Sequence, residues 1–311
     1  MNEVEFYLED LKSKFSKINP NEYYLAYSGG RDSHFLLWFI REYLKETRIP
    51  AVFENTGMEI PEIRERALAN SDIILKPALK HAEIKEKYGI PLNTKASDDW
   101  VYRYQKMRRE GIEEKDMPPY LKYMALRDVT ATPRGRRTGM LSMMCVNKKT
   151  SDAMRAGTLH KVSNLCCYFL KKKPGHIYIE RERERGYEKH EILGIMGSES
   201  IRRQAMVNKT GCFTKNKAFM PIHDLTEDLR NKIEEYCGIP IPSVYQYVNQ
   251  TGCAGCPYGQ HGKDKFFNTN LDLNLCHEGQ RKFILDYFRE SYEFKGYEFT
   301  PMIFQAEGIY S

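Results

Sequence analysis

A glycine turn between a predicted strand and a predicted helix constrains the fold of this chain more than any other feature. Residues 23–27 predict a buried strand, residues 28–33 have the sequence SGGRDS, and residues 34–45 carry apolar side chains at helical spacing. Glycines let backbone N–H groups approach a ligand closely, and a helix N-terminus adds a partial positive charge. The hydroxyls of Ser28 and Ser33 supply further donors. The turn therefore predicts a phosphate site, with a plain strand–helix turn as the alternative.

Strand and helix patterns continue to alternate beyond this turn. Residues 51–54 predict a second strand, Pro61 suits the first turn of a helix, residues 72–75 predict a third strand, and residues 81–88 predict another helix. Such alternation is typical of a parallel sheet covered by helices. We therefore expect an α/β fold with a mostly parallel, Rossmann-like sheet and flanking helices.

The positive charge of the chain is concentrated in one stretch. Residues 102–161 contain fourteen lysines or arginines against six acidic residues, within a net charge of +6, and Tyr102 and Tyr104 interleave with the basic side chains. Mixed basic and aromatic residues suit a nucleic-acid backbone with occasional base stacking. A solvated basic surface, or a lid over the phosphates of a nucleotide, is the alternative.

Four of the eight cysteines form two close pairs, Cys166 with Cys167 and Cys253 with Cys256. Clustered thiols in a reducing compartment more often hold a metal or react than form disulfides. Four thiolates are the usual ligands of a 4Fe–4S cluster, and four cysteines also suit a structural zinc ion. Because a vicinal pair fits a zinc knuckle poorly, we favour iron–sulfur, with zinc and no metal as alternatives. We expect the two pairs to converge.

In combination these motifs resemble the PAPS reductase family of the PP-loop, or adenine nucleotide alpha-hydrolase-like, superfamily. The SGGRDS turn is similar to its SGGxDS loop, and the NTG sequence at residues 55–57 is similar to its DTG-type motif. The cysteine pairs resemble the cluster motif of 4Fe–4S adenylylsulfate reductases. Other segments that resemble the family are CCYFLKKKP at 166–174, GIMGSESIRR at 194–203, PIHDLTED at 221–228 and TGCAGCP at 251–257.

The resemblance implies that the chain binds an adenine nucleotide, either ATP/AMP or APS/PAPS, and a 4Fe–4S cluster. It assigns the cluster to Cys166, Cys167, Cys253 and Cys256. Asp32 is a candidate catalytic residue that would position Mg²⁺ if the ligand is ATP. The residues expected to bind the nucleotide are Ser28, Gly29, Gly30, Arg31, Asp32, Ser33, Asn55, Thr56, Gly57, Gly194, Ser200 and Arg203.

Two departures separate the chain from the sulfonucleotide reductases that it resembles. The tail at residues 295–311 contains no cysteine, whereas those enzymes carry a nucleophilic cysteine there. Cys276 is a candidate catalytic nucleophile in its place, and a buried apolar thiol is the alternative. Met196 stands where the family has an arginine, for which Arg202 and Arg203 are candidate substitutes. Both departures weaken the case for APS or PAPS reduction.

We expect three regions. Residues 1–97 and 162–250 form the nucleotide-binding core, in which residues 191–196 predict a further strand. Residues 98–161 form a basic, partly helical insertion or lid, and residues 251–311 complete the cysteine site.

The expected activity is ATP-dependent, adenylating sulfur transfer that releases pyrophosphate. The alternatives are a thiol-dependent APS/PAPS reductase that releases sulfite and a non-catalytic nucleotide- or redox-sensing module. The expected partners are a sulfur donor protein or small thiol, such as a cysteine desulfurase or thioredoxin, nucleic acid at residues 102–161, and a second copy of the chain in a homo-oligomer.

A cytoplasmic location without membrane contact is predicted. The longest apolar run, residues 35–40, is far shorter than the roughly 20 residues that span a bilayer. The N-terminal residues lack the basic-then-apolar layout of a signal peptide.

Overall fold

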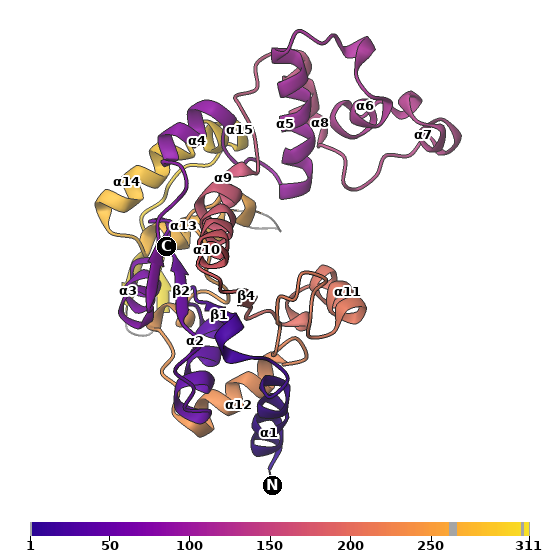
Figure 1. Ribbon diagram of the computed structural model, residues 1–311. Helices are drawn as coiled ribbons and strands as arrows, with labels where there is room; N and C mark the ends of the chain where they lie inside the picture. The colour runs from indigo at the N-terminus through magenta and orange to yellow at the C-terminus, as the bar shows by residue number, and fades with distance from the viewer. Residues whose placement is uncertain (1, 261–265, 306–307, 311) are drawn as a thin grey trace. The chain divides into compact units, whose positions relative to one another are not determined.

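The chain divides into two compact units in the computed structural model, which describes residues 2–260, 266–305 and 308–310 (Figure 1). Unit 1 comprises Met1–Pro77 and Lys171–Gly252, and unit 2 comprises Ala78–Leu170 and Cys253–Ser311. The basic insertion therefore shares its unit with the C-terminal segment and with both cysteine pairs. This division differs from the boundaries expected from the sequence.

Unit 1 is built on a four-stranded, all-parallel sheet with the strand order β3-β2-β1-β4. Leu25 of β1 pairs with Ala51 of β2 on one side and with Ile192 of β4 on the other. The predicted α/β, Rossmann-like fold is thus confirmed. The strands are β1 (Tyr23–Ala26), β2 (Ala51–Glu54), β3 (Ile73–Leu75) and β4 (His190–Ile192).

Helices cover both faces of this sheet. Because side chains alternate along a strand, Leu25 and Tyr24 point to opposite faces. Leu25 packs into a core with Phe35, Phe39 and other apolar residues of the flanking helices, and Tyr24 packs with Tyr178 of α10. The helices of unit 1 are α1 (Glu3–Phe15), α2 (Arg31–Trp38), α3 (Pro61–Asn70), α10 (Lys173–Glu184), α11 (Ile201–Thr210) and α12 (Glu227–Cys237).

Unit 2 is mainly helical, and the insertion within it has its own core. Leu92, Val101, Leu126 and Val146 are fully buried there, and Leu121 packs beside them. Its helices are α4 (His81–Tyr88), α5 (Lys95–Arg109), α6 (Pro119–Leu126), α7 (Pro133–Thr138), α8 (Lys148–Arg155), α9 (Leu165–Cys167), α13 (Phe267–Asn274), α14 (Glu278–Tyr287) and α15 (Arg289–Lys295), followed by the hairpin of β5 (Ile303–Gln305) and β6 (Gly308–Tyr310).

None of the helices among the described residues combines the length and the apolar character that a membrane crossing requires.

Candidate functional site

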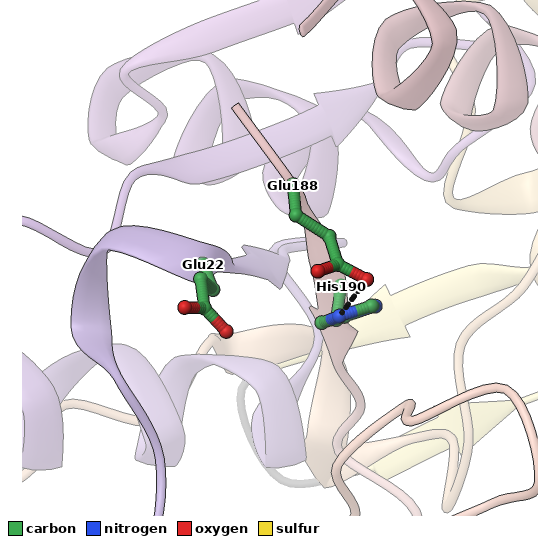
Figure 2. A group of neighbouring side chains, drawn as sticks. All are labelled: Glu22, Glu188 and His190. Atoms are coloured by element: carbon green, nitrogen blue, oxygen red, sulfur yellow. Dashed lines mark ion pairs between the residues drawn. The ribbon is translucent and has the colours of Figure 1, made fainter. Parts of the chain in front are cut away.

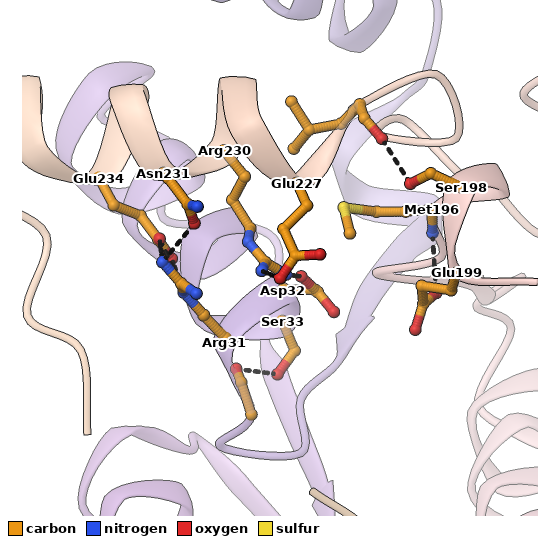
Figure 3. A network of polar contacts seen from close by, with 12 residues as sticks. Arg31, Asp32, Ser33, Met196, Ser198, Glu199, Glu227, Arg230, Asn231 and Glu234 are labelled. Atoms are coloured by element: carbon orange, nitrogen blue, oxygen red, sulfur yellow. Dashed lines mark hydrogen bonds and ion pairs between the residues drawn. The ribbon is translucent and has the colours of Figure 1, made fainter. Parts of the chain in front are cut away.

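A pocket of about 510 Å³ opens at the carboxyl ends of β1 and β4 in unit 1. The chain places β2 and β3 on one side of β1 and β4 on the other, so this pocket lies where the strand order reverses. Open α/β sheets bind their ligands at this switch point. The side chains and loops that form its walls include most of the predicted glycine turn, together with Gly194 and Arg203. Arg230 of α12 faces Asp32 in this wall (Figure 3).

The glycine turn is held by its own hydrogen bonds. The Ser28 N–H donates to Ser33 Oγ at 3.2 Å, and Ser33 Oγ donates to the Gly30 carbonyl at 3.0 Å. Gly29 has a φ of +74°, and a Cβ there would overlap the Ile63 carbonyl oxygen. Helix α2 begins directly after Gly30, so its first N–H groups and their partial positive charge belong to the pocket wall.

Each of the three arginines in the pocket wall already pairs with a carboxylate. Arg230, which is 5% exposed, pairs with Asp32, and Arg203 pairs with Glu199. An entering phosphate would therefore compete with these two carboxylates for the guanidinium groups. The turn and α12 meet through the first of these pairs (Figure 3).

Arg31 contributes to the pocket through its backbone rather than its charge. Its guanidinium donates to the buried carboxylate of Glu234, with Nε 2.8 Å from Oε2, and to Asn231 Oδ1 at 2.7 Å. Its backbone N–H donates to Tyr245 Oη at 2.9 Å. Burial raises the pKa of Glu234, and the Arg31 guanidinium opposes that shift.

The segment after β4 brings some of its predicted residues to the pocket. A Cβ on Gly194 would lie 3.1 Å from the Ser33 nitrogen, so the absence of a side chain lets β4 approach α2. Met196 is buried in the pocket wall at the position where the resembling family has an arginine. Ser200 instead caps α11, accepting the Arg203 N–H at 3.2 Å. The Arg202 side chain lies outside what the structure describes.

The NTG motif, residues 55–57, follows β2 and is not among the residues that form this pocket within the described chain. Thr56 Oγ1 donates to Glu59 Oε1 at 2.6 Å, and Arg64 Nε donates to Asn55 Oδ1 at 3.0 Å. Gly57 N–H donates to Asn55 Oδ1 at 3.2 Å. The side chains of the motif thus bond within the motif, to Glu59 and to α3. Its expected role in nucleotide binding stays a prediction.

Sequence reasoning missed several pocket residues. Arg230 pairs with Asp32 across 198 positions, and Tyr245 reaches the glycine turn from a segment without regular pattern. The helix-start segment at 221–228 was a signal for the position of α12, but nothing in the spacing pointed to Arg230 itself.

A half-buried acidic group, Glu54, lies against helix α10 in the same unit. Burial, and then the neighbouring Glu191 carboxylate, raise the pKa of Glu54 to about 7. Tyr24 Oη donates to Glu191 Oε1 at 2.9 Å, and a Cβ on Gly175 of α10 would lie 3.3 Å from Glu54 Oε1. The folded chain therefore holds Glu54 protonated at pH values where an unfolded chain would ionise it.

This group makes stability depend on pH. Because the folded pKa of Glu54 lies above the ordinary value of 4.5, its contribution is complete below about pH 4.5 and is lost as the pH rises through about 7. We expect Glu54→Gln to remove that loss, so that the variant gains stability relative to the wild type between pH 5 and pH 8. Urea unfolding at both pH values measures the difference. Glu65→Gln, an exposed change on α3, should leave the pH dependence as it is.

The four predicted cluster cysteines all lie in unit 2. Cys166 and Cys167 belong to α9, with sulfur atoms 4.0 Å apart. Cys253 and Cys256 bracket a tight turn in which the Cys256 N–H donates to the Cys253 carbonyl at 3.2 Å. Gly255 has a φ of +65°, and a Cβ there would lie 2.8 Å from Tyr292 Oη, so the turn requires glycine. All eight cysteines of the chain are thiols.

The two pairs lie near one another. The Cys167 thiol and burial raise the pKa of Cys166, and the charges of Cys256 and Cys253 raise it further. Burial raises the pKa of Cys256, to which the charges of Cys253 and Cys167 contribute. Lys95 opposes that shift with its positive charge. A cationic metal centre would stabilise the thiolate forms of Cys166 and Cys256, which the neighbouring thiols disfavour.

Four thiols are a donor set that suits either a structural zinc ion or a 4Fe–4S cluster. A tetrahedral zinc ion with Zn–S bonds of about 2.3 Å needs sulfur atoms about 3.8 Å apart. Among the described residues, three ligand atoms within 4.8 Å of one another occur in one group, and that group contains no cysteine. Tyr287 Oη is also buried, without a hydrogen-bond partner in the described chain. Burial raises the pKa of Tyr287, and the charges of all four cysteines raise it further. Because a vicinal pair such as Cys166 and Cys167 fits a zinc site poorly, the four thiols fit a 4Fe–4S cluster, with zinc as the alternative.

The group with close ligand atoms consists of Glu22, Glu188 and His190 (Figure 2). It lies at the amino ends of β1 and β4, at the opposite end of these strands from the pocket. Lys217 Nζ lies 3.2 Å from Glu188 Oε1, and Asn19 Nδ2 donates to Glu22 Oε1 at 2.9 Å. Because both carboxylates have such partners, we assign no ion to this group.

Cys276 lies at the end of α13 and is 6% exposed. Its thiol donates to the Asp272 carbonyl at 3.2 Å, and burial, followed by the Asp272 charge, raises the pKa of Cys276 to about 12. A thiol with that pKa is protonated at neutral pH and is a poor nucleophile. These surroundings favour the alternative in which Cys276 is a buried structural thiol.

The fold and the pocket define an α/β protein with a Rossmann-like parallel sheet and a candidate phosphate site at its switch point. Among solved structures, the chain is similar to the U34-tRNA thiolase NcsA from Methanococcus maripaludis with its [4Fe-4S] cluster. The identity is 15%, the match covers 95% of this chain and 82% of that chain, and the TM-score is 0.30. No protein-family model and no curated protein matches the sequence. So low a TM-score does not establish a shared function.

Proposed function

We propose that this chain is an iron–sulfur enzyme that uses ATP to activate an oxygen atom of an acceptor and then replaces that oxygen with sulfur. One observation carries the proposal: the chain combines a pocket with a helix N-terminus at the switch point of its sheet and four neighbouring thiols in its other unit. The pocket fits the phosphates of a nucleotide, and the thiols fit a cluster.

The reaction balances in two steps. The acceptor oxygen attacks the α-phosphorus of ATP, the bond to the β-phosphate breaks, and pyrophosphate leaves. A sulfur nucleophile at the oxidation level of sulfide then attacks the carbon that carries the adenylated oxygen. The C–O bond breaks, and AMP leaves with the oxygen. No net oxidation occurs, so the donor can be a protein-bound or free sulfide equivalent.

The residues of the chain divide these tasks. The Arg31 N–H donates to Tyr245, so the next N–H groups of α2, those of Asp32 and Ser33, and the Arg230 guanidinium would bind phosphate oxygens. Asp32 would hold the Mg²⁺ ion that accompanies ATP, a role for which carboxylate oxygen is suited. Cys166, Cys167, Cys253 and Cys256 would hold the cluster. When bound, the cluster would supply bridging sulfide, which is sulfur at the oxidation level that the second step needs.

The reductase alternative needs a reactive thiol, and the structure does not favour one at Cys276, whose pKa is raised to about 12. It also needs an arginine where Met196 is buried. A nucleotide-sensing module without turnover is the remaining alternative.

Three assays on anaerobically purified protein separate these functions. We expect about four irons and four acid-labile sulfides per chain, and pyrophosphate from ATP when sulfide and a mixture of cellular RNAs are present. Sulfite from APS or PAPS without pyrophosphate from ATP would instead identify a reductase. Nucleotide binding with neither product would identify a sensing module, and a zinc protein without iron would overturn the proposal.

A further inference from the structure

The helical insertion of unit 2 contains a hollow of about 540 Å³, a volume in the range of pockets that hold small organic groups. It lies among α6, α7 and the segment that joins them. Three prolines stiffen its wall by fixing their own backbone φ angles. The wall of the hollow includes Pro118, Tyr120, Tyr123, Pro133 and Arg134.

Aromatic rings in this hollow form a supported platform. Tyr123 is buried, its hydroxyl donates to the Met140 carbonyl at 3.0 Å, and it accepts the Ser142 N–H at 2.9 Å, so its ring is fixed. Tyr120 stacks on Tyr123 with ring centroids 6.3 Å apart and meets Trp100 edge-on at 5.4 Å. Tyr120 nevertheless remains 56% exposed. An exposed ring held by two inner rings offers a flat face to a ligand.

Uncompensated positive charge stands beside this platform. Arg134, Arg136 and Arg137 of α7 are exposed, and none of them belongs to an ion pair in the described part of the chain. By contrast, Arg103 of α5 lies over the Trp100 ring and pairs with Asp99 at 2.9 Å. Arg136 Nη1 donates to the Thr130 carbonyl at 2.7 Å, which holds this guanidinium but does not neutralise its charge. The exposed α7 arginines are therefore available for an anionic partner.

We propose that this hollow binds an unpaired base of single-stranded nucleic acid, which stacks on Tyr120 while adjacent phosphates contact the α7 arginines. A flat aromatic face and neighbouring guanidinium groups are the combination that single strands recognise. A duplex keeps its bases stacked inside, and an acidic polypeptide has carboxylates but no regular supply of flat rings. The binding itself does not depend on the proposed function. That the bound strand is the sulfur acceptor does rest on it.

Fluorescence anisotropy on the full-length holoprotein, without ATP, tests this binding. The probes are a mixed-sequence single-stranded RNA, the matching single-stranded DNA, the duplex and poly-glutamate. We expect Tyr120→Ala to weaken single-strand binding about 5- to 150-fold, the range for loss of one stacked base. Replacing Arg134, Arg136 and Arg137 with alanine should make the slope of log affinity against log salt shallower by about 2.

Matched controls come from unit 1. Tyr187→Ala removes a ring of similar exposure, 58%, and replacing Lys12, Lys45 and Arg48 with alanine removes three exposed positive charges. Both controls should keep wild-type affinity. Equal binding of poly-glutamate, or single-strand binding that Tyr120→Ala leaves unchanged, would overturn the proposal, as would no binding of either strand. The RNA and DNA arms show which strand is preferred. If the wild-type protein binds the single strand but releases no pyrophosphate from ATP, the proposed function is wrong and the binding proposal stands.

Discussion

Replacing Cys253 with alanine is expected to abolish cluster binding, so that iron falls from about four per chain to near zero together with acid-labile sulfide. Each thiolate of a four-cysteine site holds a different iron atom, and the three remaining thiols would leave one iron without a protein ligand. Cys253 lies in a tight turn that has no other cysteine besides Cys256, so no neighbouring thiol can replace it. Iron and sulfide analysis and visible absorption after anaerobic purification measure the effect.

Two other cysteines provide the controls for that result. Cys276→Ala removes a thiol from the same unit, and Cys212→Ala removes a half-buried thiol from unit 1. Both variants should retain full iron and sulfide, because neither thiol is among those whose charges act on Cys166. Retained iron in Cys253→Ala, or iron lost equally in all three variants, would contradict the assignment. Cys276→Ala also tests the nucleophile, because a reductase that used it would lose sulfite release.

The sheet of unit 1 was predictable because its signals are local. Residues 23–27 and 51–54 are short apolar runs that end in turn residues, and β1 and β2 lie there. The SGGRDS turn was also predictable, because glycine and serine between a strand and a helix are typical of a tight turn. A positive φ at Gly29 and a helix that begins after Gly30 follow directly from those residue types.

The charge pairs of the pocket could not be predicted, because they depend on how distant segments pack. Sequence alone suggests that Arg31 and Arg203 are available cations, yet Arg31 pairs with Glu234 and Arg203 with Glu199. The Asp32 partner, Arg230, comes from a helix 198 positions away. Spacing along the chain contains no information on which of several acids a guanidinium will meet after folding.

The packing of the insertion could not be predicted from its sequence either. Residues 98–161 have scattered prolines and weak periodicity, but Val101, Leu121 and Leu126 pack into a core that Leu92 and Val146 complete. Short helices that share one core show little periodicity individually. The hollow at Tyr120 arises from that packing, because residues of both α6 and α7 line it once the two helices have folded together.

Gly29→Ala is expected to weaken ATP binding by at least about 30-fold. The variant places a side chain where φ is +74°, where the Ile63 carbonyl oxygen would overlap it and Ala67 Cβ would lie 2.9 Å away. Left-handed backbone costs an L-residue about 1–2 kcal/mol, and overpacking adds about 1–3 kcal/mol, so keeping the binding conformation costs about 2–5 kcal/mol. A tenfold loss of affinity corresponds to about 1.4 kcal/mol. Isothermal titration of ATP with Mg²⁺ measures the change.

Gly238→Ala separates this effect from backbone strain alone. Gly238 ends α12 at a φ of +65°, and a Cβ there would have nothing within 4 Å. The Gly238→Ala variant has the backbone strain without a clash, and residue 238 lies outside the pocket wall. Its ATP affinity should therefore stay within about twofold of that of the wild type. Thermal melts show whether either chain is folded. An added side chain at position 29 would displace the backbone N–H groups that start α2. A folded Gly29→Ala protein that binds ATP as tightly as Gly238→Ala would therefore show that the nucleotide does not bind at the turn.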